Sequence, residues 1–234
     1  RAESDPLVKA VVLKINSPGG AVGASQEIAK EIKDFDKPVV VFMGDMVASG
    51  GYYISCQADK IVAKPGTLAG SIGVISQFMD LSGLYEKLGI KVQTIKSGEH
   101  KDMFMRTLTP EEQESWQKLS DELYAQFIEE VAKGRNLKVE KVKELATGEL
   151  YTGTQAKKLG LVDKLGGYQD AIDLAAELVK IEKPIVEEYG PPTLFEQLFG
   201  LSSAQINGLI RMKLLGRDYF LLENLSSSNG VPKY

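Results

Sequence analysis

The chain has 234 residues, 43% of them hydrophobic, and its 28 basic and 32 acidic residues give a net charge of -4. This length and apolar content predict a globular protein with one large core, or one domain with an appendage. Because no basic face is visible we expect no nucleic-acid partner, and one cysteine with one histidine excludes a structural zinc cluster.

Apolar runs alternate with a helical pattern at the start of the chain. Leu7 to Asn16 and "VVVFM", residues 39–43, are apolar and β-branched, which is typical of buried strands. Between them, apolar residues recur at helical spacing in "QEIAKEIKDF", residues 26–35, with Ser25 as the expected cap. After the second strand, Tyr52 to Ala58 can continue as a helix packed under it.

The same alternation continues to about residue 98. Residues 60–74 supply a short strand and a turn at Pro65, and residues 81–89 predict a short helix that Gly89 caps. "IKVQTIKSG", residues 90–98, alternates apolar and polar residues and predicts a further strand. Alternating strands and helices favour an α/β layered fold, in which ligands meet loops at strand ends.

A long helix opens the second half of the chain. Thr109 and Glu112 form a capping box with Pro110 at the first helical position, which predicts a helix to about Lys133. We interpret its apolar stripe as core: Trp116, Leu119, Leu123, Phe127 and Val131. Shorter helices are expected at residues 139–146, 154–159 and 168–180.

Ser49 lies at a strand-to-helix corner, in "MVASGGYYIS", residues 46–55. A serine there is either a nucleophile held by a strained turn or a small residue that lets two backbones pass closely, and this stretch alone leaves both open. A nucleophile needs a base and oxyanion donors. Gly19 and Gly20 follow the first strand and could present such donors, although they also fit an ordinary Pro-Gly turn.

The identity of a base is open in the same way. His100, the single histidine, sits in a polar stretch typical of an exposed loop. Lysine serves instead in Ser-Lys variants of the triad. A free lysine has a pKa near 10.4, so a lysine base needs desolvation between apolar walls to lower that pKa. Cys56 is interpreted as a small buried residue, and no cofactor or metal is expected.

Six motifs in order resemble the signal peptide peptidase A family of serine proteases, which is of the S49 type and has the ClpP/crotonase fold. The resemblance runs from about Leu7 to Leu174, which is most of the chain, and the order of the motifs makes chance similarity improbable. The motifs are "INSPGG" (15–20), "ASGGYYIS" (48–55), "GSIGV" (70–74), "KSGEHKD" (96–102), "LTPEE" (108–112) and "GLVDKLGG" (160–167).

The resemblance implies a role for five residues. Ser49 is the nucleophile and Lys101 is the general base by that resemblance. Ser71 resembles the family's serine that hydrogen-bonds the lysine amine. Gly20 and Gly50 resemble the donors of the oxyanion hole. The segment "KDMFMRTLTP", between the lysine and the long helix, is shorter than is usual in the family.

The resemblance also implies an α/β, ClpP/crotonase-like layered fold of repeated β-β-α units. The catalytic domain is expected over residues 1–190, and a helical extension with a flexible tail over residues 191–234. The implied protein is a membrane-associated endopeptidase that degrades cleaved signal peptides and similar apolar peptide segments. It is expected to form a homo-oligomer with enclosed active sites.

The expected location follows from the same resemblance. The chain starts at Arg1 and not at a methionine, so we expect it to be a fragment that lacks the family's opening strands and membrane anchor. The whole protein is then expected at the cell membrane, with a single-pass N-terminal anchor and the catalytic domain on the extracytoplasmic side.

Two other functions stay open. A ClpP-like Ser-His-Asp protease would use His100, whereas the resemblance assigns the base to the neighbouring Lys101. A crotonase-like acyl-CoA enzyme, or an inactive scaffold, would share the fold without a nucleophilic serine. Labelling of Ser49 by an acylating inhibitor would separate either of these from a serine protease.

Overall fold

The computed structural model describes residues 2–189 and 219–226. The chain divides into two compact units. The larger unit comprises residues 1–72 and 128–234, and the smaller unit comprises residues 73–127.

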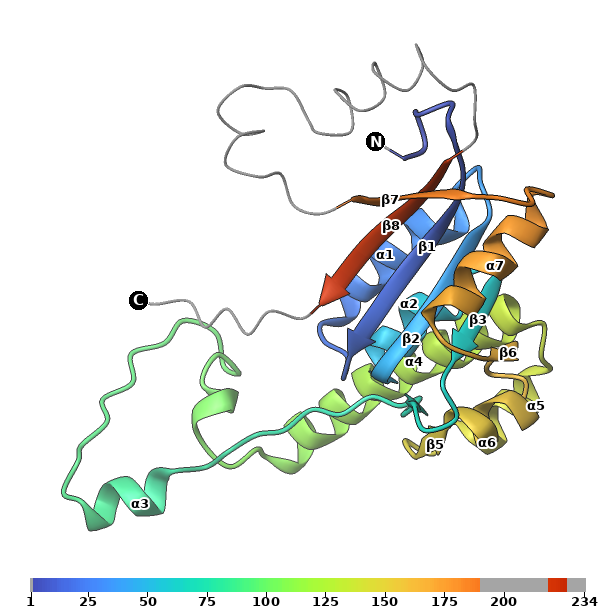
Figure 1. Cartoon of the computed structure of the whole chain (residues 1–234). Coiled ribbons are helices and arrows are strands. Elements are labelled where there is room, and N and C mark those ends of the chain that lie inside the picture. Colours follow the sequence, from blue (N-terminus) through green and yellow to red (C-terminus); the bar gives the residue numbers. More distant parts are fainter. Residues whose placement is uncertain (1, 190–218, 227–234) are drawn as a thin grey trace, which may run out of the picture. The chain divides into compact units, whose positions relative to one another are not determined.

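The larger unit is built on a mostly parallel sheet (Figure 1). Its main strands follow the order β5-β4-β2-β1-β8-β7, with β3 pairing with β2 and β6 pairing with β3. Only the pair of β4 and β5 is antiparallel among the described strands. The strands are β1 (Val8–Ser17), β2 (Val39–Ala48), β3 (Lys60–Ala63), β4 (Leu68–Gly70), β5 (Leu150–Thr152), β6 (Lys164–Leu165), β7 (Ile185–Tyr189) and β8 (Tyr219–Ser226).

Helices cover both faces of this sheet. Figure 1 shows α7 in front of β1, β2 and β3, and α1 behind the strands. Successive strand residues point to opposite faces, so alternate residues of each central strand pack under α7. The helices of the unit are α1 (Val22–Lys33), α2 (Gly50–Ser55), α5 (Val139–Leu145), α6 (Gly153–Lys158) and α7 (Tyr168–Leu178). The buried cluster under α7 comprises Ala10, Val12, Val40, Phe42, Val62, Ala171, Ile172, Ala175 and Ala176.

The prediction that Ser25 caps a helix is wrong. Helix α1 begins at Val22, with Ala21 as its N-cap. Ser25 lies inside the first turns, where its buried hydroxyl donates to the Ala21 carbonyl at 3.0 Å. A serine inside a helix can bond the carbonyl four residues back, and this satisfies its hydroxyl without capping.

The smaller unit contains α3 (Ser82–Lys87), the 3₁₀ helix η1 (Met103–Met105) and the first turns of α4 (Pro110–Arg135). The strand predicted over residues 90–98 is absent. Within the described residues no strand pairs with this segment, and Ile90, Val92 and Ile95 are all exposed. Alternation of apolar residues favours an extended chain, but a strand also needs a partner for its backbone groups.

The predicted capping box of α4 is confirmed. The Thr109 N–H donates to Glu112 Oε2 at 2.9 Å, and the Glu112 N–H donates to Thr109 Oγ1 at 3.3 Å. The apolar stripe of α4 is core only at its C-terminal end, because Phe127 and Val131 are buried whereas Leu119 is exposed.

The expected boundary near residue 190 stays a prediction. Most of the helical extension and tail that we expected over residues 191–234 lies outside the described residues. Residues 219–226, which belong to that expected extension and tail, form strand β8 and pair in parallel with β1.

Replacing Gly134 by alanine is expected to destabilise the larger unit. A Cβ at this position of α4 would lie 2.1 Å from the Cys56 carbonyl oxygen, so the helix must move away from α2. Such overpacking costs about 1–3 kcal/mol, and chemical denaturation should show this loss in the free energy of unfolding. Gly23→Ala in α1 is the control, because its Cβ meets nothing within 4 Å and should not destabilise the fold. Equal stabilities of the two variants would contradict the packing argument.

Candidate active site

Ser49 occupies a strained backbone position between β2 and α2. Its φ of 50° and ψ of -122° are uncommon for a residue other than glycine. Two hydrogen bonds hold this conformation: the Ser49 N–H donates to the Gly70 carbonyl at 2.8 Å, and the Ser49 carbonyl accepts from the Tyr53 N–H at 2.9 Å. The Ser49 hydroxyl makes no capping hydrogen bond to α2. The corner therefore fixes the backbone and leaves the hydroxyl at the end of the strand.

The glycine loop after β1 lies directly against this corner. A Cβ on Gly19 would lie 2.9 Å from both Gly50 N and Ser49 Cβ, and a Cβ on Gly50 would lie 3.1 Å from Gly20 N. Gly19 also has a φ of 116°, which favours glycine. The structure therefore brings Gly20 and Gly50, the two predicted oxyanion donors, next to each other.

The N–H groups of Gly20 and Gly50 have no hydrogen-bond acceptor among the described residues, 2–189 and 219–226. Backbone N–H groups beside a serine hydroxyl can stabilise negative charge on a carbonyl oxygen during acyl transfer. The arrangement is therefore chemically suited to an oxyanion hole, which stays a prediction for these two residues.

Ser71 leaves the sheet beside Ser49. Strands β2 and β4 run parallel with Ala48 opposite Gly70, so Ser49 and Ser71 are the next residues at the same edge. Ser71 also has a φ of 50°, and its N–H donates to the Glu149 carbonyl at 2.7 Å. The structure thus brings Ser71 to the corner where the resemblance requires it, and its role toward a lysine stays a prediction.

Asn16 is a part of the site that sequence reasoning missed. Its Oδ1 accepts from the N–H groups of Asp45 and Met46 at 3.1 and 3.0 Å, shortly before Ser49 on β2. These bonds tie the end of β1 to β2 where the register of the two strands shifts. An asparagine near the end of an apolar strand, just before "SPGG", is the sequence signal that could have identified it.

Lys101 lies in the smaller unit, in the turn from Gly98. Its N–H donates to the Gly98 carbonyl at 3.3 Å, and its side chain is exposed. The neighbouring His100 places Nδ1 2.8 Å from Glu112 Oε1. Because Ser49 and Lys101 belong to different units, the pairing of the nucleophile with the base stays a prediction.

The interpretation of Cys56 as a small buried residue is confirmed. It is fully buried and in the free thiol form. Desolvation raises the pKa of the Cys56 thiol to about 12, because burial disfavours the thiolate. A thiol that stays protonated at neutral pH is a poor nucleophile, so Cys56 is not an alternative to Ser49.

Neither a metal-binding cluster nor a membrane-spanning helix is found in residues 2–189 and 219–226. No group of three or more histidine, cysteine, aspartate or glutamate side chains in these ranges could hold a metal ion. In the same part of the chain, no helix combines the length and apolar character that crossing a membrane requires.

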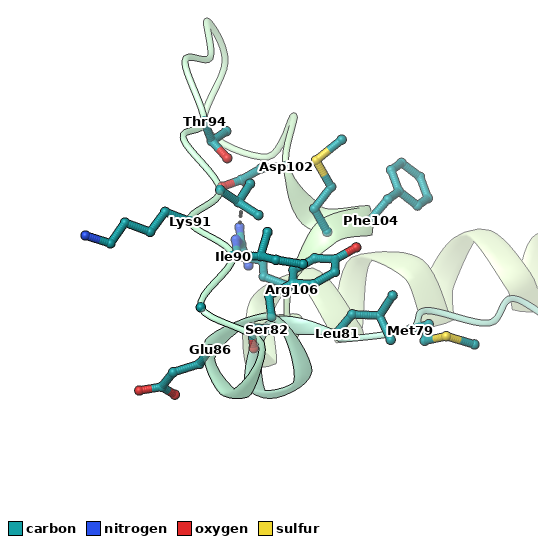
Figure 2. Close-up of a pocket in the computed structure, with 14 residues that line it drawn as sticks. Met79, Leu81, Ser82, Glu86, Ile90, Lys91, Thr94, Asp102, Phe104 and Arg106 are labelled. Atoms are coloured by element: carbon teal, nitrogen blue, oxygen red, sulfur yellow. Dashed lines mark hydrogen bonds and ion pairs between the residues drawn. The ribbon is translucent and has the colours of Figure 1, made fainter.

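A pocket of about 840 Å³ lies in the smaller unit, near the turn that carries Lys101. Figure 2 shows it between α3, the extended segment after α3 and η1. Arg106 Nη2 contacts Asp102 Oδ1 at 3.1 Å in its wall, and the rest of the lining is largely apolar. Its apolar members include Met79, Leu81, Ile90, Val92, Phe104 and Met105.

Comparison with known proteins gives both a family and a fold. Residues 31–182 match the sequence model described as peptidase family S49. A protein of Synechocystis whose name describes a candidate protease is 46% identical over 82% of this chain and 72% of its own length. An Enterococcus faecium protein named as a candidate signal peptide peptidase SppA is 45% identical over 81% of this chain and 56% of its own length.

The chain spans less than two thirds of some of its relatives. One from Methanocaldococcus jannaschii, also named as a candidate protease, is 43% identical over 80% of this chain and 62% of its own length. Among solved structures, a ClpP1 variant from Listeria monocytogenes is similar in fold, with a TM-score of 0.50 and 19% identity. The match covers 73% of this chain and 80% of that one. The predicted ClpP-like α/β fold is therefore confirmed.

Proposed function

The chain belongs to peptidase family S49, a family of serine proteases, and from this premise we propose that it hydrolyses peptide bonds with Ser49 as nucleophile and Lys101 as general base. The Ser49 corner carries this proposal. A serine in a strained strand-to-helix turn lies beside two glycine N–H groups that donate to no other described residue. Packing alone requires small residues at this place, but it does not require strain at a hydroxyl-bearing one.

The proposed reaction is acyl transfer through an ester. The neutral Lys101 amine takes the Ser49 proton as Oγ attacks the peptide carbonyl carbon, and the N–H groups of Gly20 and Gly50 bind the oxyanion. Collapse of the tetrahedral intermediate breaks the C–N bond, and the Lys101 ammonium gives its proton to the leaving amine. Water then hydrolyses the ester with the same base, while the Ser71 hydroxyl orients the amine.

The proposed substrates are cleaved signal peptides and other apolar peptide segments. The name of the Enterococcus relative and the apolar pocket of the smaller unit support this choice. A preceding single-pass membrane anchor, with the catalytic domain on the extracytoplasmic side, belongs to the same proposal. Fractionation of the whole protein from cells would test it, because the anchor must carry the activity into the membrane fraction.

A homo-oligomer with enclosed active sites is also part of the proposal. The described smaller unit exposes many large apolar side chains, and exposure on this scale marks surfaces that a partner covers. Those that do not line the pocket include Ile75, Leu84, Leu88, Ile95 and Leu119. Light scattering should show an oligomer at micromolar concentration, and a monomer would contradict the cavity model.

The second candidate is a serine protease that uses a Ser-His triad, with His100 as the base. One observation favours it. His100 Nδ1 lies 2.8 Å from Glu112 Oε1, as a carboxylate orients the histidine of a triad. However, Arg106 binds both oxygens of the same carboxylate at 2.8 Å and competes for its charge. We therefore retain Lys101 as the base.

The proposal is tested by covalent labelling and by substrate preference. A fluorophosphonate probe should add one group to the intact protein, and peptide mapping should place it on Ser49. The labelled protein should then lose its cleavage of a synthetic apolar signal peptide. A hydrophilic peptide of the same length is the control and should be cut more slowly. Failure to label, or equal cleavage of the two peptides, would contradict the serine mechanism or the substrate class respectively.

A further inference from the structure

Glu112 makes more contacts than helix capping needs. Its side chain is only 2% exposed, although it stands at the start of a helix where most acidic residues face water. The capping bond from the Thr109 N–H uses Oε2 at 2.9 Å. In addition, Arg106 donates to Oε2 and Oε1, each at 2.8 Å, and His100 Nδ1 lies 2.8 Å from Oε1. The extra contacts all lead toward the turn that carries Lys101.

Both chain neighbours of Lys101 are held by this network. His100 is fixed by Glu112, and Asp102 Oδ1 accepts from Lys96 Nζ at 2.8 Å and from Arg106 Nη2 at 3.1 Å. Arg106 therefore joins the two sides, because its planar guanidinium reaches both carboxylates at once. Lys101 stands between two anchored residues.

The charges of this network are present at any pH where a lysine base could act. Hydrogen bonds from Lys96 and Arg106 lower the pKa of the Asp102 carboxyl to about 2. Hydrogen bonds from Arg106, the Thr109 backbone and His100 hold the pKa of Glu112 well below its usual range. Folding lowers the pKa values of both Asp102 and Glu112. Their ionised carboxylates therefore stabilise the network fully above the ordinary carboxyl pKa of about 4, and this stabilisation is lost only as the pH falls below that value.

We propose that Glu112, through Arg106 and His100, is a positioning residue that holds the Lys101 backbone for proton transfer. The inference rests on the proposed role of Lys101 as the base. A lysine side chain is long and flexible, so its amine reaches a hydroxyl repeatedly only if the backbone below it stays in place. Small displacements of a reacting group, on the order of 1 Å, can cost about 100-fold in rate.

Glu112→Gln tests this proposal, because glutamine keeps the size of the side chain and can keep a capping bond but loses the charge that binds Arg106. We expect kcat, measured per Ser49 counted by titration with the fluorophosphonate probe, to fall about 10- to 100-fold. KM for the apolar peptide should change less than threefold, which corresponds to less than about 0.7 kcal/mol. A purely structural role would lower the number of active sites and leave kcat per site unchanged.

Glu114→Gln is the matched control. Glu114 stands on the same helix and pairs with Lys118 at 2.7 Å, and its side chain is 69% exposed. Among the described residues it has no hydrogen bond or ion pair with the Lys101 turn. Its kcat per site should stay within twofold of the wild type. Arg106→Lys is the second variant if Glu112→Gln does not fold, since lysine keeps the charge and loses the two-pronged contact. It should also lose kcat per site.

The outcomes separate this inference from the proposed function. If Lys101→Ala is inactive while Glu112→Gln and Arg106→Lys match the Glu114→Gln control, Lys101 remains the base and the positioning role is wrong. If Lys101→Ala remains active, the proposed base is wrong, and the inference that depends on it falls with it. A loss of kcat per site in both network variants, with the control unaffected and Lys101→Ala inactive, supports the positioning role.

Discussion

Ser49→Ala is expected to lower kcat/KM for an apolar peptide by about 10⁴-fold or more, because it removes the atom that forms the acyl-enzyme ester. The two glycine N–H groups remain, so any residual rate above the uncatalysed reaction reports binding and oxyanion stabilisation alone. The variant should bind the peptide nearly as well as the wild type. Steady-state kinetics and peptide binding by fluorescence anisotropy measure the two quantities separately.

Matched variants show whether the loss is chemical. Ser55→Ala changes a buried serine on the same helix, where the hydroxyl donates to the Gly51 carbonyl at 2.7 Å. It should cost about 1 kcal/mol of stability and leave kcat/KM within a few-fold of the wild type. Ser49→Gly should be as inactive as Ser49→Ala and more stable than it, because glycine tolerates the φ of 50°. A folded Ser49→Ala protein with full activity would overturn the serine mechanism.

The buried part of the fold could be predicted because its strands carry a strong local pattern. The β-branched apolar runs of β1 and β2 are typical of buried strands, and both strands are largely buried. The capping box of α4 satisfies its backbone groups with side chains no more than four residues away. In contrast, β8 depends on pairing with β1, which lies some two hundred residues earlier in the sequence. No local pattern encodes a partner at that distance. The error at residues 90–98 has the same origin, since alternation says nothing about a partner.

The candidate site likewise has one part that could be predicted from the sequence and one part that could not. The glycines beside Ser49 could be predicted because backbone contact leaves no room for a Cβ, and small residues in the sequence record that restriction. The network around Glu112 could not be predicted. Arg106, Asp102 and Lys96 look like ordinary solvated charges in a polar stretch, and only the folded chain shows that they join one carboxylate to both neighbours of Lys101.

Lys101→Ala is expected to abolish peptidase activity to a similar degree, because no other group in the proposed mechanism takes the Ser49 proton. The Ser49 hydroxyl remains, so slow labelling by a highly reactive fluorophosphonate should still be detectable after long incubation. Wild-type kcat/KM should rise with pH and stay high into the alkaline range, since only the neutral form of the proposed lysine base accepts a proton. A wild-type profile that is flat from about pH 5 to 9 would remove the support for a lysine base.

His100→Ala decides between the lysine base and the histidine triad. Under the proposed mechanism it removes one of the two anchors of the Lys101 turn, because Asp102 keeps its bonds to Lys96 and Arg106. Activity should therefore fall by no more than about 10-fold, well short of the loss in Lys101→Ala. The triad predicts the reverse order, because His100 would then carry the proton and Glu112 would orient it. An inactive His100→Ala protein beside an active Lys101→Ala protein would transfer the role of base to His100.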